Sequence, residues 1–431
     1  MKDGGRLSAA IEVLTEVETR HRPVQPALRD WGTSHRFAGS GDRTVIGNLV
    51  FDALRHKSSL TARTGSSEPR MQILGTYVFA WGNGIDRLKE VLGEDPHSPE
   101  ALNEAEESAL ANESVDDLEP EVAADVPAWL WPYFEAAFGD NAVNEGKALA
   151  TRAPIDLRTN SLKSDREKLL KRLAHVNAEA TSITPTALRI KAKPGASRMP
   201  HVQAEEGYRK GWFELQDEAS QIAAALACAK PGEQVLDLCA GGGGKTLALA
   251  ATMDNKGQIY AYDSDRLRLA PIHERLQRSS VRNVQVRDPA SSNLDPLKEA
   301  MDLVFIDAPC TGTGVWRRRP DSKWKLSEKA LADRLEEQRK VLDTAKEFVK
   351  LGGRIAYVTC SILPQENGDQ VKRFLAENSD FEAVDAIAIW KHVFGEDRLP
   401  AYVTEEGGVT LTPATTETDG FFFALLGRKT D

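Results

Sequence analysis

The sequence has 431 residues, which is more than one ordinary domain holds, since single hydrophobic cores stop growing at about 250 to 300 residues. An apolar fraction of 41% and a charged fraction of 28% are typical of a soluble globular chain, and no stretch approaches the ~20 apolar residues of a membrane span. No apolar signal-like segment follows Met1, so a cytoplasmic protein without a membrane partner is expected. Four cysteines without CxxC spacing exclude a disulfide framework and structural zinc, and no metal is expected.

The net charge of −10 would argue against a nucleic-acid partner, because binding phosphates needs Lys and Arg. Its distribution reverses that conclusion. Residues 94–125 hold twelve Asp or Glu and no Lys or Arg, whereas residues 147–210 hold fourteen Lys or Arg against six Asp or Glu. An acidic segment therefore masks a basic one, and RNA remains a candidate partner.

Residues 1 to about 90 carry helix-like apolar spacing, for example at Leu7, Ile11 and Leu14. The acidic residues at about 94–126 favour a flexible linker over a binding tail. An aromatic stretch around residues 129–134 follows and is expected to complete a helical domain across the linker. These features predict an all-α N-terminal domain over residues 1–145.

Residues 146–212 contain short alternating stretches such as Ala187–Lys191, which predict a small basic α/β unit. Residues 213–431 alternate between strand and helix patterns, which predicts an α/β domain with a parallel sheet covered by helices on both faces. The expected strands are Gln234–Leu238, Gln258–Asp263, Asn283–Asp288, Met301–Ala308 and Arg354–Cys360, and the expected helices start at Lys245, cover about Leu267–Gln277 and cover Leu326–Lys350. Ligands of such sheets bind at the carboxyl ends of the strands.

The first strand of this domain runs into a glycine-rich loop and then a helix. The loop residues are Cys239, Ala240, Gly241, Gly242, Gly243, Gly244 and Lys245. Successive glycines let the backbone approach a ligand closely at a helix N-terminus. A phosphate-binding loop of type GxxxxGK[ST] fits Gly244-Lys245-Thr246 but requires Gly where Cys239 stands, so a nucleoside triphosphatase is the weaker alternative.

The next two strands end in acidic residues that favour a nucleoside. Asp263 can accept hydrogen bonds from both ribose hydroxyls, and Asp288 is placed to contact an adenine amino group. A loop for the amino-acid part, an acid for the ribose and a polar group for the base together predict S-adenosylmethionine as cofactor. Each Asp alone would be an equally ordinary helix cap.

The fourth and fifth strands end in Asp307-Ala-Pro-Cys310 and Thr359-Cys-Ser361, which brings two thiols to the cofactor edge. Carbon 5 of cytosine is a poor nucleophile, so its methylation requires a thiolate to add at carbon 6. Asp307 is placed to hold the cytosine ring, and the second thiol can assist removal of the carbon-5 proton. The chemistry does not decide which of Cys310 and Cys360 attacks, and two buried core thiols are the plainer alternative.

These motifs resemble the Sun family of RNA cytosine-5 methyltransferases, especially the bacterial 16S ribosomal RNA enzymes. The resemblance rests on the two cysteine motifs, on Leu157-Arg-Thr-Asn160, on Phe213–Gln221 and on Gly420-Phe-Phe-Phe423. It implies a Rossmann-like class I methyltransferase sheet acting on RNA, with transfer RNA as an alternative to ribosomal RNA, and a monomer. It implies Cys360 as nucleophile, Cys310 as the residue of product release, and Asp307 near both cofactor and cytosine.

Two features bear on substrate and cofactor binding. The family's cofactor loop usually reads Ala-Ala-Pro-Gly-Gly-Lys, whereas this chain has Ala240-Gly-Gly-Gly-Gly-Lys245, and loss of the proline predicts a more flexible empty loop. Residues 317–325 mix five cations with Trp324 and follow Trp316. We expect this segment to bind RNA phosphates and a flipped base, with the basic unit holding flanking RNA and the N-terminal domain assisting.

Overall fold

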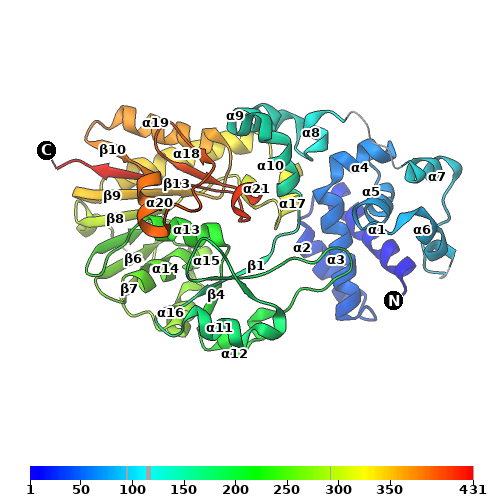
Figure 1. Ribbon diagram of the computed structural model, residues 1–431, viewed down its shortest axis with the longest axis horizontal. Helices are drawn as coiled ribbons and strands as arrows, with labels where there is room; N and C mark the ends of the chain where they lie inside the picture. Colours follow the sequence, from blue (N-terminus) through cyan, green and yellow to red (C-terminus); the bar gives the residue numbers. More distant parts are fainter. Residues whose placement is uncertain (94–95, 113–117, 292, 431) are drawn as a thin grey trace. The chain divides into compact units, whose positions relative to one another are not determined.

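The computed structural model describes residues 1–93, 96–112, 118–291 and 293–430. The chain separates into two compact units (Figure 1). The helical unit comprises Met1–Ala153, Ala192–Pro200 and Trp316–Lys325, and the sheet unit comprises Pro154–Lys191, His201–Val315 and Leu326–Asp431. No helix in the described ranges combines the length and the apolarity that crossing a bilayer requires. The domain boundaries given above stay a prediction.

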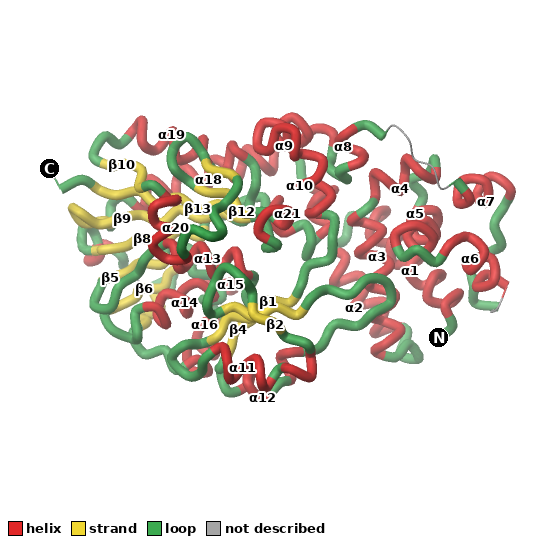
Figure 2. The backbone as a smooth tube through the Cα atoms, viewed as in Figure 1, coloured by secondary structure: helices red, strands yellow, loops and turns green. Residues whose placement is uncertain are grey.

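The helical unit contains helices and no strand within its described residues (Figure 2). Apolar residues at helical spacing, such as Leu7, Ala10 and Leu14 of α1, are almost completely buried because that stripe faces the core. The main helices are α1 (Asp3–Thr19), α2 (Val24–Ser34), α3 (Ser40–Arg55), α4 (Lys57–Thr64), α5 (Pro69–Gly75), α6 (Gly84–Gly93), α9 (Trp131–Phe138), α10 (Ala142–Leu149) and α17 (Pro320–Lys325). The predicted helical N-terminal region is confirmed.

Part of the acidic segment that was predicted to be a linker is helical. Helix α7 (Glu104–Ala111) begins after Asn103, whose side chain accepts from the Glu106 N–H while the Glu106 carboxylate accepts from the Asn103 N–H. This reciprocal capping satisfies two amide groups that a helix start leaves open. Leu110 is buried, and the short α8 (Pro120–Ala123) follows. Residues 94–95 and 113–117 of the predicted linker lie outside the described residues.

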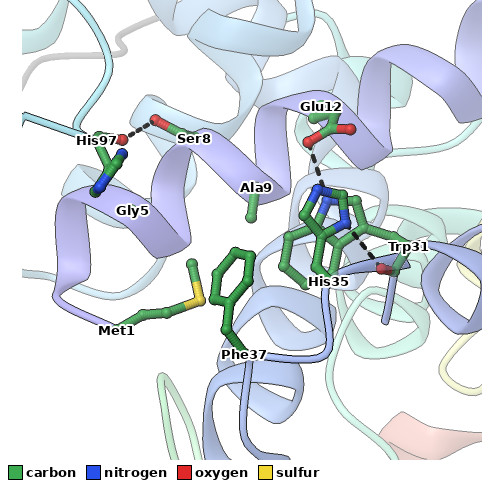
Figure 3. Close-up of a pocket in the computed structure, with 9 residues that line it drawn as sticks. All are labelled: Met1, Gly5, Ser8, Ala9, Glu12, Trp31, His35, Phe37 and His97. Carbon is green, nitrogen blue, oxygen red and sulfur yellow. Dashed lines mark hydrogen bonds between the residues drawn. The ribbon is translucent and has the colours of Figure 1, made fainter. Parts of the chain in front are cut away.

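An apolar cavity of about 510 Å³ lies in the helical unit between residues of α1 and α2 (Figure 3). His35 stacks on Trp31 with ring centroids 4.3 Å apart, and the indole N–H of Trp31 donates to the Glu12 carboxylate. The ring of Phe37 lies beside the stacked rings of His35 and Trp31, and the residue is 72% exposed. The sequence patterns predicted no site here.

A small four-stranded antiparallel sheet forms in the sheet unit, with strand order β2-β3-β1-β4. Buried Asp156 of its first strand accepts two hydrogen bonds of 2.7 Å from buried Arg189 of the neighbouring strand, so the charges neutralise each other across the sheet. Its elements are β1 (Ile155–Thr159), β2 (Glu179–Ala180), β3 (Ala187–Ile190) and β4 (Phe213–Leu215), with α11 (Arg166–Arg172) and α12 (Glu206–Arg209). A small α/β unit was predicted over this part of the chain.

The large sheet has nine strands and confirms the predicted Rossmann-like α/β fold. Strands β9, β8, β5, β6 and β7 are adjacent in that order and run parallel, and β13 joins β9 antiparallel. The strands are β5 (Gln234–Asp237), β6 (Gln258–Tyr262), β7 (Val284–Arg287), β8 (Met301–Asp307), β9 (Val349–Thr359), β10 (Phe381–Val384), β11 (Tyr402–Val403), β12 (Val409–Leu411) and β13 (Phe421–Arg428). Because these five strands run parallel, their carboxyl ends all lie at one edge of the sheet. The five are β9, β8, β5, β6 and β7.

Helices cover both faces of this sheet, and each face has its own apolar core. One core packs α13 (Glu218–Leu226), α14 (Gly244–Thr252) and α20 (Ala386–Phe394) on the strands. The other packs α18 (Glu328–Ala345) and α19 (Gly368–Glu377) on the opposite face. Strand residues alternate between the two cores, since successive strand side chains point to opposite faces. The short α15 (Arg266–Leu269) and α16 (Ile272–Ser279) connect β6 to β7.

The helix predicted over Leu326–Lys350 is shorter than expected. Helix α18 begins after Ser327, whose hydroxyl accepts from the Ala330 N–H, and it ends at Ala345. Strand β9 already begins at Val349 and passes through Gly352, whose φ of +71° is open mainly to glycine. The pairing of β8 with β9 is irregular there, so a bulge separates the two parts of the strand.

The prediction that residues 317–325 and the preceding Trp316 bind RNA is wrong for the side chains that are buried. Trp316 and Lys323 are each 1% exposed, and Trp316 stacks on Phe134 with ring centroids 5.8 Å apart. The Lys323 ammonium donates to the Arg55 carbonyl over 3.0 Å, and the Trp324 indole N–H donates to the Leu54 carbonyl over 2.6 Å. The side chains of Trp316 and Lys323 therefore belong to the interior of the helical unit, whereas Arg319 and Lys325 are exposed.

Candidate active site

The glycine-rich loop joins β5 to α14 at the carboxyl edge of the large sheet. Gly241 and Gly243 have φ values of +48° and +80°, which turn the loop sharply before the helix. A Cβ atom on Gly243 would come within 2.5 Å of Ile272, so only glycine fits between the loop and α16. The loop amides thus lie at the start of a nine-residue helix, where the helix dipole favours a negatively charged group.

Asp263 follows β6 and faces the loop. Its Oδ2 accepts from the Gly241 N–H over 2.9 Å, and its Oδ1 accepts from the Asp265 N–H over 2.9 Å. The residue is 2% exposed. Each carboxylate oxygen has a second lone pair, so Asp263 can still accept from a ligand hydroxyl.

A cavity of about 540 Å³ opens beside these residues. This volume lies in the usual range of small-molecule sites. Its lining combines the strand-end residues with one face of α18: Leu238, Cys239, Tyr262, Asp263, Ser264, Arg268, Asp307, Pro309, Arg334, Glu337, Lys340, Val341 and Thr344. Burial among three nearby carboxylates raises the pKa of the Cys239 thiol well above its ordinary value.

The sequence patterns missed the contribution of α18. Arg334, Glu337, Val341 and Thr344 recur at intervals of three or four residues, which places them on one helix face. The sequence shows this periodicity, but it does not indicate which face of the helix meets the strand ends. Asp288, expected near an adenine, is not part of the cavity lining. Its Oδ1 instead accepts from the Ala290 N–H over 2.9 Å.

Lys245 and Asp307 meet at the cavity's edge. The ammonium of Lys245 lies 2.7 Å from Asp307 Oδ2 and 5.1 Å from the ring centroid of Phe421. Lys245 is 8% exposed, whereas Asp307 stays partly accessible. The ion pair therefore fixes the Asp307 carboxylate while leaving part of it open to a substrate.

Cys310 and Cys360 are the two half-buried thiols at the same edge, and their Sγ atoms lie 3.3 Å apart. The hydrogen bond to Cys360 and burial together raise the pKa of Cys310 well above its ordinary value. Cys310 therefore keeps its proton at neutral pH. A protonated thiol is a poor nucleophile but can donate a hydrogen bond.

Buried Glu366 holds the loop that carries Cys310. Its carboxylate accepts from the Thr311 N–H over 2.8 Å and from the Thr311 hydroxyl. The side-chain amide of Gln338, on α18, donates to both Glu366 and the Pro309 carbonyl over 2.9 Å. The Tyr357 hydroxyl donates to the Glu366 carbonyl. Glu366 and Gln338 together thus fix the backbone on both sides of Cys310.

A second buried network holds the loop that carries Cys360. The Thr359 hydroxyl donates to Asn367 Oδ1 over 2.6 Å, and Asn367 Nδ2 donates to the Ser361 carbonyl over 3.0 Å. The hydroxyls of Ser361 and Thr313 hydrogen-bond at 2.9 Å. Because Thr313 follows the Cys310 loop, this contact ties the two thiol-bearing loops to each other.

Asp237, the last residue of β5, lies beneath the loop and is 1% exposed. Burial raises its pKa to about 7, and the nearby Asp307 contributes in the same direction. Oδ2 accepts from the Thr246 hydroxyl over 2.6 Å, while Oδ1 has no partner. A carboxyl in this position is protonated much more readily than an exposed one.

Comparisons with known proteins agree with this geometry. Residues 223–427 match the family described as 16S rRNA methyltransferase RsmB/F. Residues 126–195 match a ferredoxin-like domain described as Methyltr_RsmF/B-like. The first match contains all the strand-end residues described above, and the second covers the first three strands of the small sheet.

Among similar proteins is one named ribosomal RNA small subunit methyltransferase B, from Sodalis glossinidius. It is 34% identical over 307 residues, which is 70% of this chain and 66% of that protein. A solved structure named PH0851 has 25% identity, a TM-score of 0.73 and 99% coverage of both chains. A methyltransferase homolog from Pyrococcus horikoshii has 26% identity and a TM-score of 0.58 over 72% of this chain and 97% of its own.

Proposed function

The chain belongs to the RsmB/F methyltransferase family through its ferredoxin-like and methyltransferase domains, and we propose that it methylates carbon 5 of a cytosine in 16S ribosomal RNA. The observation that carries this proposal is the pair of thiols, Cys310 and Cys360, whose Sγ atoms lie 3.3 Å apart. Cys310 directly follows Pro309, which lines the nucleoside-sized cavity, although the two cysteines do not line it themselves. Carbon-5 methylation of a pyrimidine requires a thiolate, and a second group must take the carbon-5 proton.

S-adenosylmethionine fits the residues around the cavity. Main-chain amides from Cys239 to Lys245 would hold its amino-acid part, and buried Asp263 would accept from its ribose hydroxyls. The cavity volume of about 540 Å³ suits a nucleoside. When bound, this cofactor supplies an electrophilic methyl group. Asp288 remains a proposed contact to the base, although it does not line the cavity.

In the proposed reaction the Cys360 thiolate adds to carbon 6 of the cytosine and forms an S–C6 bond. The added electron density reaches carbon 5, which takes up the methyl group. Asp307, positioned by Lys245, accepts from the exocyclic amine and passes the proton released by Cys360 to the ring nitrogen, so that the addition leaves no net charge on the ring. A water beside Cys310 then takes the carbon-5 proton, and the S–C6 bond breaks to release the methylated cytosine and the Cys360 thiolate.

The division of roles between the two thiols is the one that the family resemblance implies. The raised pKa of Cys310 is compatible with a thiol that keeps its proton during the addition. Cys310 can donate a hydrogen bond to the Cys360 sulfur over the observed 3.3 Å and so stabilise the thiolate. Because Cys310 keeps its proton, the carbon-5 proton passes to a water beside it, and Cys310 assists product release by donating to the departing Cys360 sulfur.

Single replacements of the cysteines test the roles. Cys360→Ala is expected to abolish methylation and form no adduct, and Cys310→Ala to accumulate a covalent protein–RNA adduct resistant to denaturing electrophoresis. Cys228→Ala, a change outside the two thiol-bearing loops, is the matched control and should behave as the unchanged protein. Adducts with Cys360→Ala and none with Cys310→Ala would reverse the two roles.

The substrate is tested separately from the chemistry. Bisulfite sequencing of cellular RNA with and without the protein should identify one 16S ribosomal cytosine that loses its methyl group. Loss confined to a transfer RNA would favour the alternative substrate. A nucleoside triphosphatase would turn over ATP, but the ammonium of Lys245 is paired with Asp307 rather than facing the loop amides.

We also propose the roles of the remaining parts. The small basic unit at 146–212 would hold RNA next to the target, and exposed Lys168 and Arg172 of α11 support this assignment. The helical N-terminal domain at 1–145 would bind RNA as well. The four cysteines form no disulfides, which supports a reducing compartment, the cytoplasm, as the place where the protein acts. We also propose that it acts as a monomer.

A further inference from the structure

We infer that Arg275 is a positioning residue that holds the glycine-rich cofactor loop in shape. The loop has four successive glycines, Gly241 to Gly244. Glycine leaves φ free, whereas a residue such as proline fixes it covalently. The loop should therefore lose much conformational entropy on ordering unless another group restrains it.

Arg275 supplies such a restraint. Its Nη1 donates to the Gly242 carbonyl over 2.6 Å, so the contact falls in the middle of the glycine run. Arg275 lies on α16, one turn after Ile272, which packs on Gly243. Helix α16 thus fixes two neighbouring loop glycines, one by a charged hydrogen bond and one by an apolar contact.

The guanidinium is itself anchored. Nε and Nη2 of Arg275 donate to Glu214 Oε2 over 3.2 and 3.0 Å, and Glu214 is 2% exposed. Because two nitrogens of the planar guanidinium already bind Glu214, the Arg275 side chain loses little conformational entropy when its third nitrogen binds the loop. Hydrogen bonds from a charged donor are also about twice as strong as neutral ones. The small sheet, through β4, therefore reaches the cofactor loop by way of Arg275.

A neighbouring contact acts in the same direction. Arg158 of β1 donates over 2.9 Å to the Gly244 carbonyl and over 2.8 Å to Gln216 Oε1. Arg158 is 6% exposed, and its burial lowers its pKa to about 10. Because replacing so buried a charge would disturb the fold, Arg275 is the better position for a test.

A proline at position 242 is tested together with the loss of Arg275, because a Cβ on residue 242 would lie 3.3 Å from Arg275 Nη1. The φ of Gly242 is not among the positive values of the described residues, and its N–H has no protein acceptor within the described part of the chain. A proline there removes no hydrogen bond and restores the covalent restraint. The inference therefore predicts that Gly242→Pro makes Arg275 dispensable.

The experiment uses the full chain and two readouts. Hydrogen exchange without cofactor reports the loop, through the Gly241 N–H bound to Asp263 and the Gly243 N–H bound to the Ala240 carbonyl. Calorimetry with S-adenosylhomocysteine reports binding. Arg275→Ala should speed exchange of both amides and weaken binding by roughly 10-fold, the usual effect of losing one charged hydrogen bond.

Arg278→Ala is the matched control, because Arg278 lies on the same helix and donates to the same Glu214 but not to the loop. It should leave both readouts within about 2-fold of the unchanged protein, as should Arg275→Ala combined with Gly242→Pro. Arg275→Lys, which keeps one donor but not the fork, should fall between. Circular dichroism confirms that each variant is folded.

The inference rests on the proposed function only through its binding readout. If the unchanged chain does not bind S-adenosylhomocysteine, the proposed function fails, while faster exchange in Arg275→Ala still supports the restraint. Exchange and binding in Arg275→Ala equal to those of the unchanged chain would overturn the inference. So would an equal loss in Arg278→Ala, since Glu214 rather than the loop contact would then be responsible.

Discussion

The Sγ atoms of Cys310 and Cys360 lie 3.3 Å apart although 50 residues separate them along the chain. Adjacent parallel strands, β8 and β9, produce this meeting, because each cysteine follows the carboxyl end of its strand. Two thiols this close share one proton in a hydrogen bond, so replacing either one changes the acidity of the other.

Replacing Cys360 should make Cys310 more acidic. The contact with Cys360 is the largest cause of the raised Cys310 pKa, so Cys360→Ala should move the pH profile of Cys310 alkylation by iodoacetamide to lower pH. Peptide mass spectrometry from pH 7 to about 10 measures that midpoint, since unperturbed thiols titrate near 8.5. Cys360→Ser keeps a hydrogen-bonding group and should shift the midpoint less. Identical midpoints in all three proteins would contradict the prediction.

Glu366→Gln should disturb the Cys310 loop. The amide keeps the shape but places an NH₂ group against one of the donors, Thr311 or Gln338, so a buried hydrogen bond is lost. We expect a loss of about 1–3 kcal/mol in stability and slower release of the RNA adduct than in the unchanged protein. Adduct lifetime and thermal unfolding measure these effects. Glu377→Gln, the same change on an exposed part of α19, should alter neither.

Asp237→Asn should change how stability depends on pH. The folded pKa of about 7 exceeds the ordinary value near 4, so between these pH values the folded protein holds a proton that the unfolded chain has released. The free energy of unfolding of the unchanged protein should therefore fall as pH rises through this window, by roughly 4 kcal/mol at most. Asn does not titrate, so the advantage of the variant should grow from pH 4 to 7. Urea unfolding of both proteins across the window measures it, and a constant difference would contradict it.

Lys323→Met should show the opposite dependence in the helical unit. Burial lowers the pKa of Lys323 to about 8, whereas an unfolded lysine titrates near 10.4. Between these values the unfolded chain binds the extra proton, so the free energy of unfolding of the unchanged protein should rise with pH by roughly 3 kcal/mol. Met does not titrate, so the advantage of the Lys323→Met variant in free energy of unfolding should be smaller at pH 10 than at pH 8. Urea unfolding of both proteins at the two pH values measures it.

The sequence patterns predicted the large sheet because its parallel strands have continuous apolar runs that end in polar residues. Asp263, Asp307 and the two cysteines meet at one edge for that reason alone. The length of α18 was predicted less well, since the bulge that lets β9 begin at Val349 depends on a positive φ at Gly352. The spacing of apolar residues does not indicate such a local irregularity.

The fate of residues 316–325 was not predictable from local pattern. A run of cations with tryptophans has the composition of an RNA-binding loop, and nothing in it specifies a partner far earlier in the chain. Trp324 donates to Leu54, 270 positions away, and Lys323 finds its acceptor at Arg55. Composition reports which groups a segment can offer, whereas tertiary contacts decide which of them stay available.

The path of the chain limits how this protein can be divided or recombined. The helical unit is assembled from three separate stretches, Met1–Ala153, Ala192–Pro200 and Trp316–Lys325. A gene fragment beginning at Pro154 would still encode two of these stretches but not the helices that bury Trp316 and Lys323. Fission or exchange at a single breakpoint would thus leave an aromatic surface and a desolvated lysine uncovered. The helical unit therefore cannot be removed intact by cutting the chain at one position before Trp316.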